Sequence, residues 1–421
     1  MANGGAELPN KMYEVRDVIY GFVKFDEQER DIINHPAFQR LRRIRQLSLT
    51  DMVYSGATHT RFEHSIGVMQ MATDMYDCIT EKSGVLLQDL LTFDEAGIMR
   101  WRKVIRLAAL LHDIGHPPFS HAGEDLMPLR KKNETKRFDH EEYSIAIIKS
   151  KFKDLIEDHP INRNYGIKVE EVTALLGDPT VRANSFALLW KNLISGQIDA
   201  DRADYLLRDS LHSGVNYGIY DRNRLIHCMV LGKTETDAPI IAIQDGGWHI
   251  AESLVLARYQ MFSQVYFHKT RRIYDRHIYL AAKEVLKNTG RKSGCYPTPD
   301  QIDAYLKFDD WEMWSGIKKG KGGKHGDIIL NRNHYRCIYE TDMIPSASDT
   351  EKIEELTQQY SAAGIETFLD HPNTKWYKLD KDIDIYGEQS GTVKSLSEIS
   401  SIVKSMVAIP QVQRLYAERR L

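Results

Sequence analysis

The chain has 421 residues, of which 27% are charged, and its formal net charge at pH 7 is −3. This length fits two or three domains, or one large helical domain with additions, and the near-neutral balance excludes a global charge that would draw the protein onto nucleic acid or anionic lipid. No apolar stretch approaches 18 residues and there is no charged-then-apolar leader, so we expect a soluble, cytoplasmic protein without a membrane partner.

Helical patterns dominate the first two thirds of the chain. Residues 1–14 are mostly small or polar, and we expect them to be disordered. Residues 18–25 are strand-like, whereas FQRLRRIRQL at 38–47 predicts a helix. Apolar residues then recur with helical spacing to about residue 288.

The pattern changes after residue 300. The basic, glycine-rich run KKGKGGK predicts a mobile loop over residues 316–326. Strand and helix patterns alternate beyond it, at residues 336–342, 353–363, 382–386 and 396–406. The expected fold class is therefore mainly α, with an all-helical core over residues 15–300 and a small C-terminal α+β region over residues 301–421.

An adjacent His112 and Asp113 follow the apolar run VIRLAALL, whose residues leave no polar face except one arginine. This run predicts a buried core helix. A core helix has no use for an imidazole and a carboxylate side by side, because each buried polar group needs a partner, and a divalent cation would satisfy both. Gly115, Pro117 and Pro118 end the predicted helix just beyond the pair.

Further nitrogen and oxygen donors for such a cation occur in two other segments. Upstream, His64 begins a helical pattern. Downstream, one segment with helical spacing holds four aspartates: Asp199, Asp201, Asp204 and Asp209. Four acids so close together repel one another unless cations neutralise some of them. His64, His112, Asp113 and one of these aspartates would form a mixed set that suits Mn, Fe, Mg, Co or Zn. The alternative is core histidines hydrogen-bonded to nearby acids.

Three motifs occur in a fixed order: HTRFEH at 59–64, HDIGHPPFSH at 112–121 and DADRADYLLRD at 199–209. Together they resemble the HD-domain metal phosphohydrolases, and most closely the deoxynucleoside-triphosphate (dNTP) triphosphohydrolases. The resemblance implies an HD-domain core over residues 15–300. It also implies a divalent-metal site with four protein ligands, which are His64, His112, Asp113 and Asp201.

The same resemblance assigns catalytic roles near the metal. Phosphoester hydrolysis needs an attacking hydroxide, neutralisation of phosphate charge and a proton for the leaving oxygen. Side chains at the positions of His116, Glu124 and His140 lie against the metal centre in the resembling enzymes, although their acid is an aspartate. The one at His121 contacts the phosphates and is a candidate to protonate the leaving 5′ oxygen. The alternative for His140 is an exposed residue at the start of a helix.

Substrate contacts are implied in the same way. A triphosphate carries more charge than one metal ion balances, so basic donors are required. The candidates for phosphate, sugar and base contacts are Arg61, Arg202, Lys269, Gln46, Leu47, Arg258 and Tyr266. Tyr205 and Asp209, four residues apart on one predicted helix face, would hold the deoxyribose 3′ hydroxyl and exclude a 2′ hydroxyl. The alternatives are a solvated basic face for the stretch around Lys269 and an ordinary core role for Tyr205.

The predicted helix at 38–47 also bears on assembly. Its apolar stripe is flanked by four arginines, and such a density of like charge needs anionic partners from another subunit or from nucleotide phosphates. In the resembling enzymes this region lies near subunit contacts, so the resemblance implies a homo-oligomer, either a dimer or a tetramer. The alternative is a solvated basic helix on a monomer. Asn34 stands where resembling enzymes have an aspartate that recognises guanine, so GTP is not expected to be required, while another regulatory nucleotide stays open.

The sequence therefore predicts metal-dependent hydrolysis of dNTPs to a deoxynucleoside and inorganic triphosphate, with no nucleic-acid partner. One alternative is an HD phosphohydrolase that acts on a nucleoside monophosphate, a cyclic nucleotide or RNA. Another is a nucleic-acid-binding or scaffold protein with a vestigial site. The presence of all four candidate metal ligands argues against a vestigial site.

Overall fold

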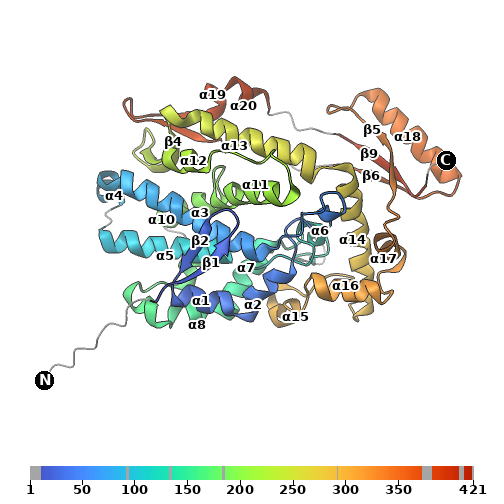
Figure 1. Ribbon diagram of the computed structural model, residues 1–421, viewed down its shortest axis with the longest axis horizontal. Coiled ribbons are helices and arrows are strands. Elements are labelled where there is room, and N and C mark those ends of the chain that lie inside the picture. Colours follow the sequence, from blue (N-terminus) through green and yellow to red (C-terminus); the bar gives the residue numbers. More distant parts are fainter. Residues whose placement is uncertain are drawn as a thin grey trace.

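The computed structural model describes residues 11–91, 94–131, 135–182, 185–291, 293–371, 382–406 and 412–419. Within these ranges the protein is mainly α, as predicted, with three small sheets (Figure 1). Its centre is formed by three helices: α3 (Arg61–Lys82), α5 (Glu95–Leu111) and α11 (Ala200–Ser213). Helix α3 lies between the other two and packs against both, so these three helices frame the interior of the protein.

Local sequence explains where the central helices begin and how closely they pack. Thr60 and Glu63 form a capping box at the start of α3, and the Asp199 carboxylate accepts the amide of Arg202 at the start of α11. Gly67 lets α3 and α11 approach each other, because a Cβ there would lie 2.1 Å from Oδ1 of Asp204. The two helices that carry the HTRFEH and DADRADYLLRD motifs are therefore in direct contact.

The described residues form seventeen other helices. They are α1 (Glu27–Asn34), α2 (Pro36–Gln39), α4 (Gly84–Leu91), α6 (His121–Glu124), α7 (His140–Ile147), α8 (Lys153–Glu157), α9 (Val169–Leu175), α10 (Ser185–Ser195), α12 (Arg222–Cys228), α13 (Trp248–Met261), α14 (Lys269–Asn288), α15 (Ile302–Tyr305), α16 (Asp310–Lys318), α17 (Gly323–Leu330), α18 (Ala347–Ala362), α19 (Leu396–Ile399) and α20 (Ser401–Ser405). Short 3-10 and π-helical turns are η1 (Arg40–Arg43), η2 (Thr50–Met52), η3 (Ile148–Phe152), η4 (Pro160–Asn164), η5 (Asp245–Gly247), η6 (Phe262–Tyr266) and η7 (Pro299–Gln301).

The N-terminal region differs from the prediction in two places. Strands β1 (Tyr13–Asp17) and β2 (Gly21–Phe25) form an antiparallel hairpin, so residues 13 and 14 are paired although disorder was expected through residue 14; residues 1–10 lie outside the described ranges. The helix predicted at 38–47 is also wrong beyond η1, since Ile44 is extended. The amide of Arg61 donates to the Ile44 carbonyl, and the amide of Gln46 donates to the His59 carbonyl. This pairing with a distant segment replaces the local helix.

The core is not wholly helical, because it contributes two strands to a mixed sheet. Strands β3 (Met229–Lys233) and β4 (Pro239–Gln244) form a hairpin. Strand β7 (Asp384–Gly387) of the C-terminal region pairs in parallel with β4, and β8 (Thr392–Ser395) follows β7. The C-terminal region expected over residues 301–421 thus shares a sheet with the core.

A second C-terminal sheet lies at one end of the protein, near α14 and α17 (Figure 1). It has the order β5 (Arg336–Glu340), β9 (Arg414–Ala417) and β6 (Thr367–Asp370), with α18 packed against β6 and β9. Ile273 of α14, Ile328 of α17 and Tyr416 of β9 share a small buried cluster. This cluster joins the sheet to the helical core.

The basic run expected as a mobile loop over residues 316–326 is mainly helical instead. Lys318 ends α16 and Gly323 begins α17, so only a short connection separates the two helices. Gly320 and Gly323 have φ values of +75° and +57°, which glycine adopts without a steric penalty. Gly316 lies directly against Val285 of α14, where a Cβ would be 2.5 Å from a valine methyl. Close packing of the flanking apolar residues therefore outweighs the polar character of the run.

Candidate metal and substrate site

The four predicted metal ligands come together from three helices. His64 lies in the first turn of α3, His112 and Asp113 directly follow α5, and Asp201 lies in the first turn of α11. His64 Nε2 is 3.0 Å from Asp201 Oδ1 and 3.5 Å from Asp113 Oδ2. His112 Nε2 is 3.3 Å from Asp113 Oδ1 and 3.8 Å from Asp201 Oδ1. One ligand atom each from His64, His112 and Asp113 thus surrounds one point, and Asp201 adjoins it through the two imidazoles.

The orientation of the two imidazoles fits a cation at this point. The ring of His64 uses Nδ1 for Asp204 at 2.8 Å, and the ring of His112 uses Nδ1 for the carbonyl of Ala109 at 2.8 Å. Because each Nδ1 donates its proton, each Nε2 is left facing the carboxylates. Against burial, hydrogen bonds to Asp201 and Asp204 raise the pKa of His64 to about 10, so a cation bound here would displace a proton from this imidazole. His112 Nε2 is buried and has no hydrogen-bond partner among the described residues. A divalent cation would satisfy this donor set of imidazole and carboxylate.

The electrostatics of the cluster agree with this arrangement. Burial alone would raise the pKa of Asp201, but the adjacent His112 and His64 side chains hold it well below its ordinary value. Burial likewise opposes the charge of Asp113, and the Arg61 guanidinium, the strongest of its cationic neighbours, holds its pKa well below the usual range. Both acids are therefore ionised, as metal ligands must be.

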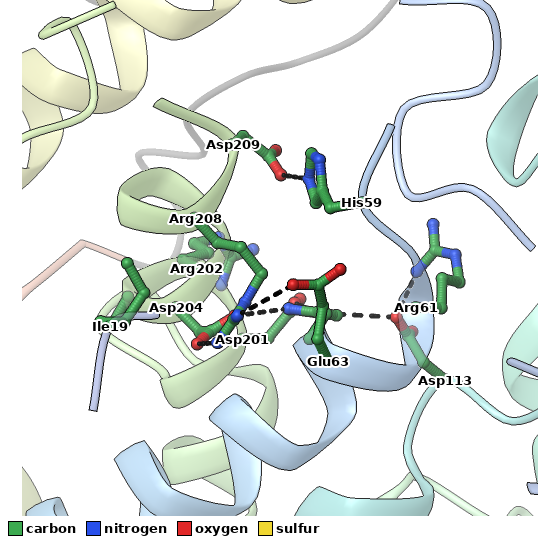
Figure 2. Close-up of polar contacts among 12 residues, drawn as sticks. Ile19, His59, Arg61, Glu63, Asp113, Asp201, Arg202, Asp204, Arg208 and Asp209 are labelled. Carbon is green, nitrogen blue, oxygen red and sulfur yellow. Dashed lines mark hydrogen bonds and ion pairs between the residues drawn. The ribbon is translucent and has the colours of Figure 1, made fainter. Parts of the chain in front are cut away.

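A buried ion-pair network holds the metal-facing part of α11 in place, and the sequence analysis did not assign it a role. Arg208 donates to both oxygens of Asp204 at 2.9 Å and to Asp17 of the N-terminal hairpin at 2.9 Å. The hydroxyl of Tyr20 also donates to Asp204, at 2.9 Å. Figure 2 shows Asp201, Asp204 and Arg208 on the same helix. Asp204 in turn orients His64, so this network fixes a candidate ligand.

The four predicted catalytic residues form a second cluster next to the first. His140 Nδ1 is 2.5 Å and His121 Nδ1 is 3.2 Å from Glu124 Oε1, and the rings of His116 and His140 stack at 3.8 Å. His116 Nε2 is 3.3 Å from Asp113 Oδ1 and so connects the two clusters. Burial opposes the charge of His140, but the Glu124 carboxylate raises its pKa to about 9. The side chain of His121 is 63% exposed and therefore accessible to a ligand.

A cavity of about 520 Å³ adjoins this second cluster. Eight of the predicted site residues line it: Gln46, Leu47, Arg61, His121, Glu124, Tyr205, Asp209 and Tyr266. Arg61 donates to Asp113 (Figure 2) and, at 2.8 Å, to the hydroxyl of Ser120, a residue of the cavity wall, so its guanidinium connects a metal ligand with the cavity. Tyr205 and Asp209 are brought into the same cavity, as the spacing on one helix face predicted.

Three predicted substrate contacts lie elsewhere. Arg202 is bonded to Asp199 and to the carbonyl of Gly196, and it lines a separate cavity of about 440 Å³ together with Arg258. The side chain of Lys269 is 54% exposed, with its Nζ 3.8 Å from a carboxylate oxygen of Glu340. None of the three predicted residues lines the 520 Å³ cavity in this structure.

Basic residues from the first turns of α14 line the 520 Å³ cavity instead: Arg271, Arg272 and Arg276. The sequence reasoning considered their stretch but selected Lys269, which precedes all three. Helical spacing identifies which residues share a face, but it does not say which face points at the cavity. A further residue it missed is His59, whose Nε2 is 2.7 Å from Oδ1 of Asp209.

A buried set of histidines and aspartates at the ends of adjoining helices, in a mainly α fold, defines the class of HD-domain proteins. Residues 61–209 match the HD domain, and residues 220–415 match the HD associated region. The chain belongs to the HD-domain family, whose domains bind divalent metals, and it is a metal-dependent phosphohydrolase of this superfamily. The family resemblance that the three motifs indicated is therefore confirmed.

Relatives and a solved structure give the extent of the similarity. An uncharacterized protein of Methanocaldococcus jannaschii is 30% identical over 424 residues, which cover 96% of this chain and 78% of that protein. The deoxynucleoside triphosphate triphosphohydrolase SAMHD1 homolog of Dictyostelium discoideum is 33% identical over 80% of this chain, which spans 62% of that enzyme. The crystal structure of a hypothetical protein from Aquifex aeolicus is 26% identical, with a TM-score of 0.77 and 97% of each chain covered. None of the described helices is both long and apolar enough to cross a membrane.

Proposed function

We propose that the protein hydrolyses dNTPs to a deoxynucleoside and inorganic triphosphate. The observation that carries this proposal is the composition of the 520 Å³ cavity. It is lined at once by Arg61 and His121, which are suited to phosphates, and by Tyr205 and Asp209, which are suited to a deoxyribose. A single cavity suited to both a triphosphate and a sugar fits a nucleotide substrate. The similarity to a dNTP triphosphohydrolase from Dictyostelium discoideum supports the same substrate class.

The proposed metal ligands are His64, His112, Asp113 and Asp201. When bound, a divalent ion there supplies Lewis acidity, which activates water and offsets phosphate charge. Mn, Fe, Mg, Co and Zn all suit imidazole and carboxylate donors. The chain's own contribution is orientation, since Asp204 holds His64 and the Ala109 carbonyl holds His112 by hydrogen bonds at 2.8 Å.

The residues around the metal site are assigned to phosphate binding and proton transfer. Arg61 is placed to donate to a phosphoryl oxygen, because it lines the cavity while also donating to the proposed metal ligand Asp113. His121 is exposed to the cavity and is placed to give a proton to the leaving 5′ oxygen. Glu124 accepts from His140 and, against burial, raises its pKa to about 9, so this pair holds a proton beside the metal site at neutral pH.

Other residues that line the cavity are assigned to the sugar and the base. We assign the 3′ hydroxyl to Asp209 and exclusion of a 2′ hydroxyl to the Tyr205 ring. Tyr266 packs on the base, beside Gln46 and Leu47. Arg202 and Lys269 reach the triphosphate, and Arg258 reaches the base, in this proposal only after they leave their present positions.

The proposal is tested by product analysis. Protein loaded separately with Mn, Fe, Mg, Co or Zn is incubated with each dNTP, each NTP, nucleoside monophosphates, cyclic nucleotides and RNA, and the products are resolved by chromatography. We expect deoxynucleoside and inorganic triphosphate in equal amounts from dNTPs. Release of pyrophosphate or monophosphate, or turnover confined to another phosphoester, would contradict the proposal.

We also infer a homo-oligomer, a dimer or a tetramer, that does not need GTP. The apolar residues of segment 38–47 are buried within one chain, but Arg42 remains exposed beside them. Light scattering at micromolar concentration and an activity titration with GTP test the two statements. A monomer would contradict the first, and activity that is absent until GTP is added would contradict the second.

A further inference from the structure

Asp310 is a buried acid that connects two separate segments of the protein. It is the first residue of α16 and is 3% exposed. Its Oδ1 accepts the amide of Phe119 at 2.7 Å, and its Oδ2 accepts the amide of Arg45 at 2.9 Å. It lies outside the residues that match the HD domain and within the HD associated region. One carboxylate thus holds two backbone positions that are 74 residues apart in the sequence.

Both segments continue directly into the cavity wall. Gln46 and Leu47 follow Arg45, and Ser120 and His121 follow Phe119; all four line the cavity. Asp310 itself does not line it. Whatever fixes the two amides therefore fixes the distance between two parts of the cavity, one proposed to face the sugar and base and the other to face the phosphates.

The segment at Phe119 needs such support because its backbone is strained. Phe119 and Ser120 have φ values of +62° and +54°, which residues with side chains rarely adopt. The strained turn is held at three points. The amide of Phe119 donates to Asp310, the Ser120 hydroxyl donates to the Arg45 carbonyl at 2.6 Å, and Arg61 donates to that hydroxyl at 2.8 Å. A chain of contacts therefore runs from Asp310 to the guanidinium proposed to bind phosphate.

We propose that Asp310 is a positioning residue of the catalytic cavity, whose ionised carboxylate fixes the segment of Gln46 and Leu47 relative to the turn that carries Ser120 and His121. The expected effect of Asp310 on turnover rests on the dNTP hydrolysis proposed above. The role itself concerns only the two hydrogen bonds and can be measured without a substrate.

The Asp310 carboxylate also changes its protonation state near neutral pH. Burial raises the pKa of Asp310 to about 7, against the two amide bonds and the nearby Arg45, while the neighbouring Asp309 adds to the rise. The buried phenol of Tyr296 faces the same carboxylate. Only the ionised form offers both oxygens as acceptors, because protonation turns one of them into a donor. The clamp is therefore complete above about pH 7 and is weakened as the pH falls below it.

The test compares Asp310→Asn with Glu312→Gln. The carboxamide of Asp310→Asn would keep one acceptor and turn its NH2 group toward the other backbone amide. Glu312 is the matched control, because it is an exposed acid in the first turn of the same helix. Hydrogen exchange is followed in peptides that cover residues 43–48 and 116–121. Metal content and steady-state dNTP kinetics are measured on the same samples.

We expect Asp310→Asn to speed exchange in both peptides and to lower kcat by roughly 10- to 100-fold at unchanged metal content, since a displacement of about 1 Å can cost that much in rate. Glu312→Gln should leave exchange in both peptides as in the wild type. Equal exchange in the two variants, or normal kcat in Asp310→Asn together with faster exchange, would overturn the proposal.

The proposal can still be tested if the variant does not fold or if the wild type does not hydrolyse dNTPs. If Asp310→Asn does not fold, exchange of the wild-type protein is measured between pH 8 and pH 6 and corrected for the intrinsic rate. Protection of both peptides should then decline below about pH 7, and constant protection would overturn the proposal. If the wild type releases no triphosphate from any dNTP, the proposed function fails, while the exchange result still decides whether Asp310 clamps the two segments.

Discussion

His59 Nε2 lies 2.7 Å from Oδ1 of Asp209, and both side chains are buried. The hydroxyl of Tyr266 donates to the other oxygen of Asp209, also at 2.7 Å. Asp209 is thus held from two sides, by a residue of the HTRFEH motif and by a residue of η6, before any substrate arrives. Such a fixed carboxylate is what a selective sugar hydroxyl site requires.

His59→Phe removes one of these bonds while it keeps an aromatic ring of similar size. We expect kcat/KM for dNTPs to fall roughly 10-fold, because one charge-assisted hydrogen bond contributes about 1.5–3 kcal/mol to holding its partner. His212→Phe is the control, since His212 stacks on His59 at 4.4 Å without a bond to Asp209. The prediction is wrong if the two variants have the same kcat/KM or if His59→Phe loses its metal.

Asp113→Asn tests the metal site itself. Loss of one ligand oxygen is expected to reduce metal affinity by at least 10- to 100-fold and activity by orders of magnitude, with little change in the helical circular dichroism. Asp77→Asn provides the control, because Asp77 lies on α3 and pairs with Arg102 away from the site. Elemental analysis after dialysis against a chelator measures the occupancy. Full occupancy with wild-type turnover in Asp113→Asn would remove Asp113 from the ligand set.

The local parts of this site could be predicted from the sequence, because each motif is short and adjoins a helix end. His112 and Asp113 follow an apolar helix, and capping residues mark the start of the helices that carry His64 and Asp201. The sequence therefore predicts where the helix before His112 ends and where the helices of His64 and Asp201 begin.

The long-range partners could not be predicted in the same way. Arg208 bonds Asp17 across 191 positions, and Asp310 bonds the amide of Phe119 across 191 positions. No local pattern records such pairs, since they depend on how distant elements pack. The position of Lys269 outside the cavity could not be predicted for a similar reason: its contact with Glu340 depends on the position of β5 beside α14.

Tyr205→Ala tests the proposed exclusion of ribonucleotides. The Tyr205 ring is 6.1 Å from the Tyr266 ring in the cavity, so its removal opens space beside Asp209. We expect the ratio of dATP to ATP turnover to narrow by roughly 10-fold or more, which is the usual range for steric discrimination. Tyr205→Phe keeps the ring and should keep the ratio. Equal turnover of dATP and ATP by the wild type would show that Tyr205 does not act as a gate.

The last prediction concerns stability and a buried histidine that does not line the 520 Å³ cavity. His277 of α14 is fully buried, and its Nε2 accepts the amide of Tyr335 at 3.2 Å. Its other nitrogen is 3.0 Å from Nδ1 of His325. Burial lowers the pKa of His277 to about 3, and the nearby His325 and His334 act in the same direction. A proton on Nε2 would also turn that atom from an acceptor into a donor that faces an amide N–H.

The sign of the pH effect follows from the two states of the chain. In the unfolded chain the pKa of His277 is about 6.5, so between that value and about 3 the unfolded state holds a proton that the folded state does not. The free energy of unfolding should therefore fall as the pH drops below about 6.5, with His277 contributing at most about 1.4 kcal/mol per pH unit. Above pH 7 this histidine contributes no pH dependence.

His277→Gln retains a side-chain oxygen that can accept the Tyr335 amide but cannot titrate. In urea unfolding at pH 7, 6 and 5, we expect its free energy of unfolding to decline less steeply than that of the wild type. His227→Gln removes an exposed histidine and should leave the wild-type slope unchanged. The other histidines titrate in both proteins, so the difference between the slopes isolates His277. Parallel slopes for the wild type and His277→Gln would show that His277 takes up its proton equally well in the folded and unfolded states.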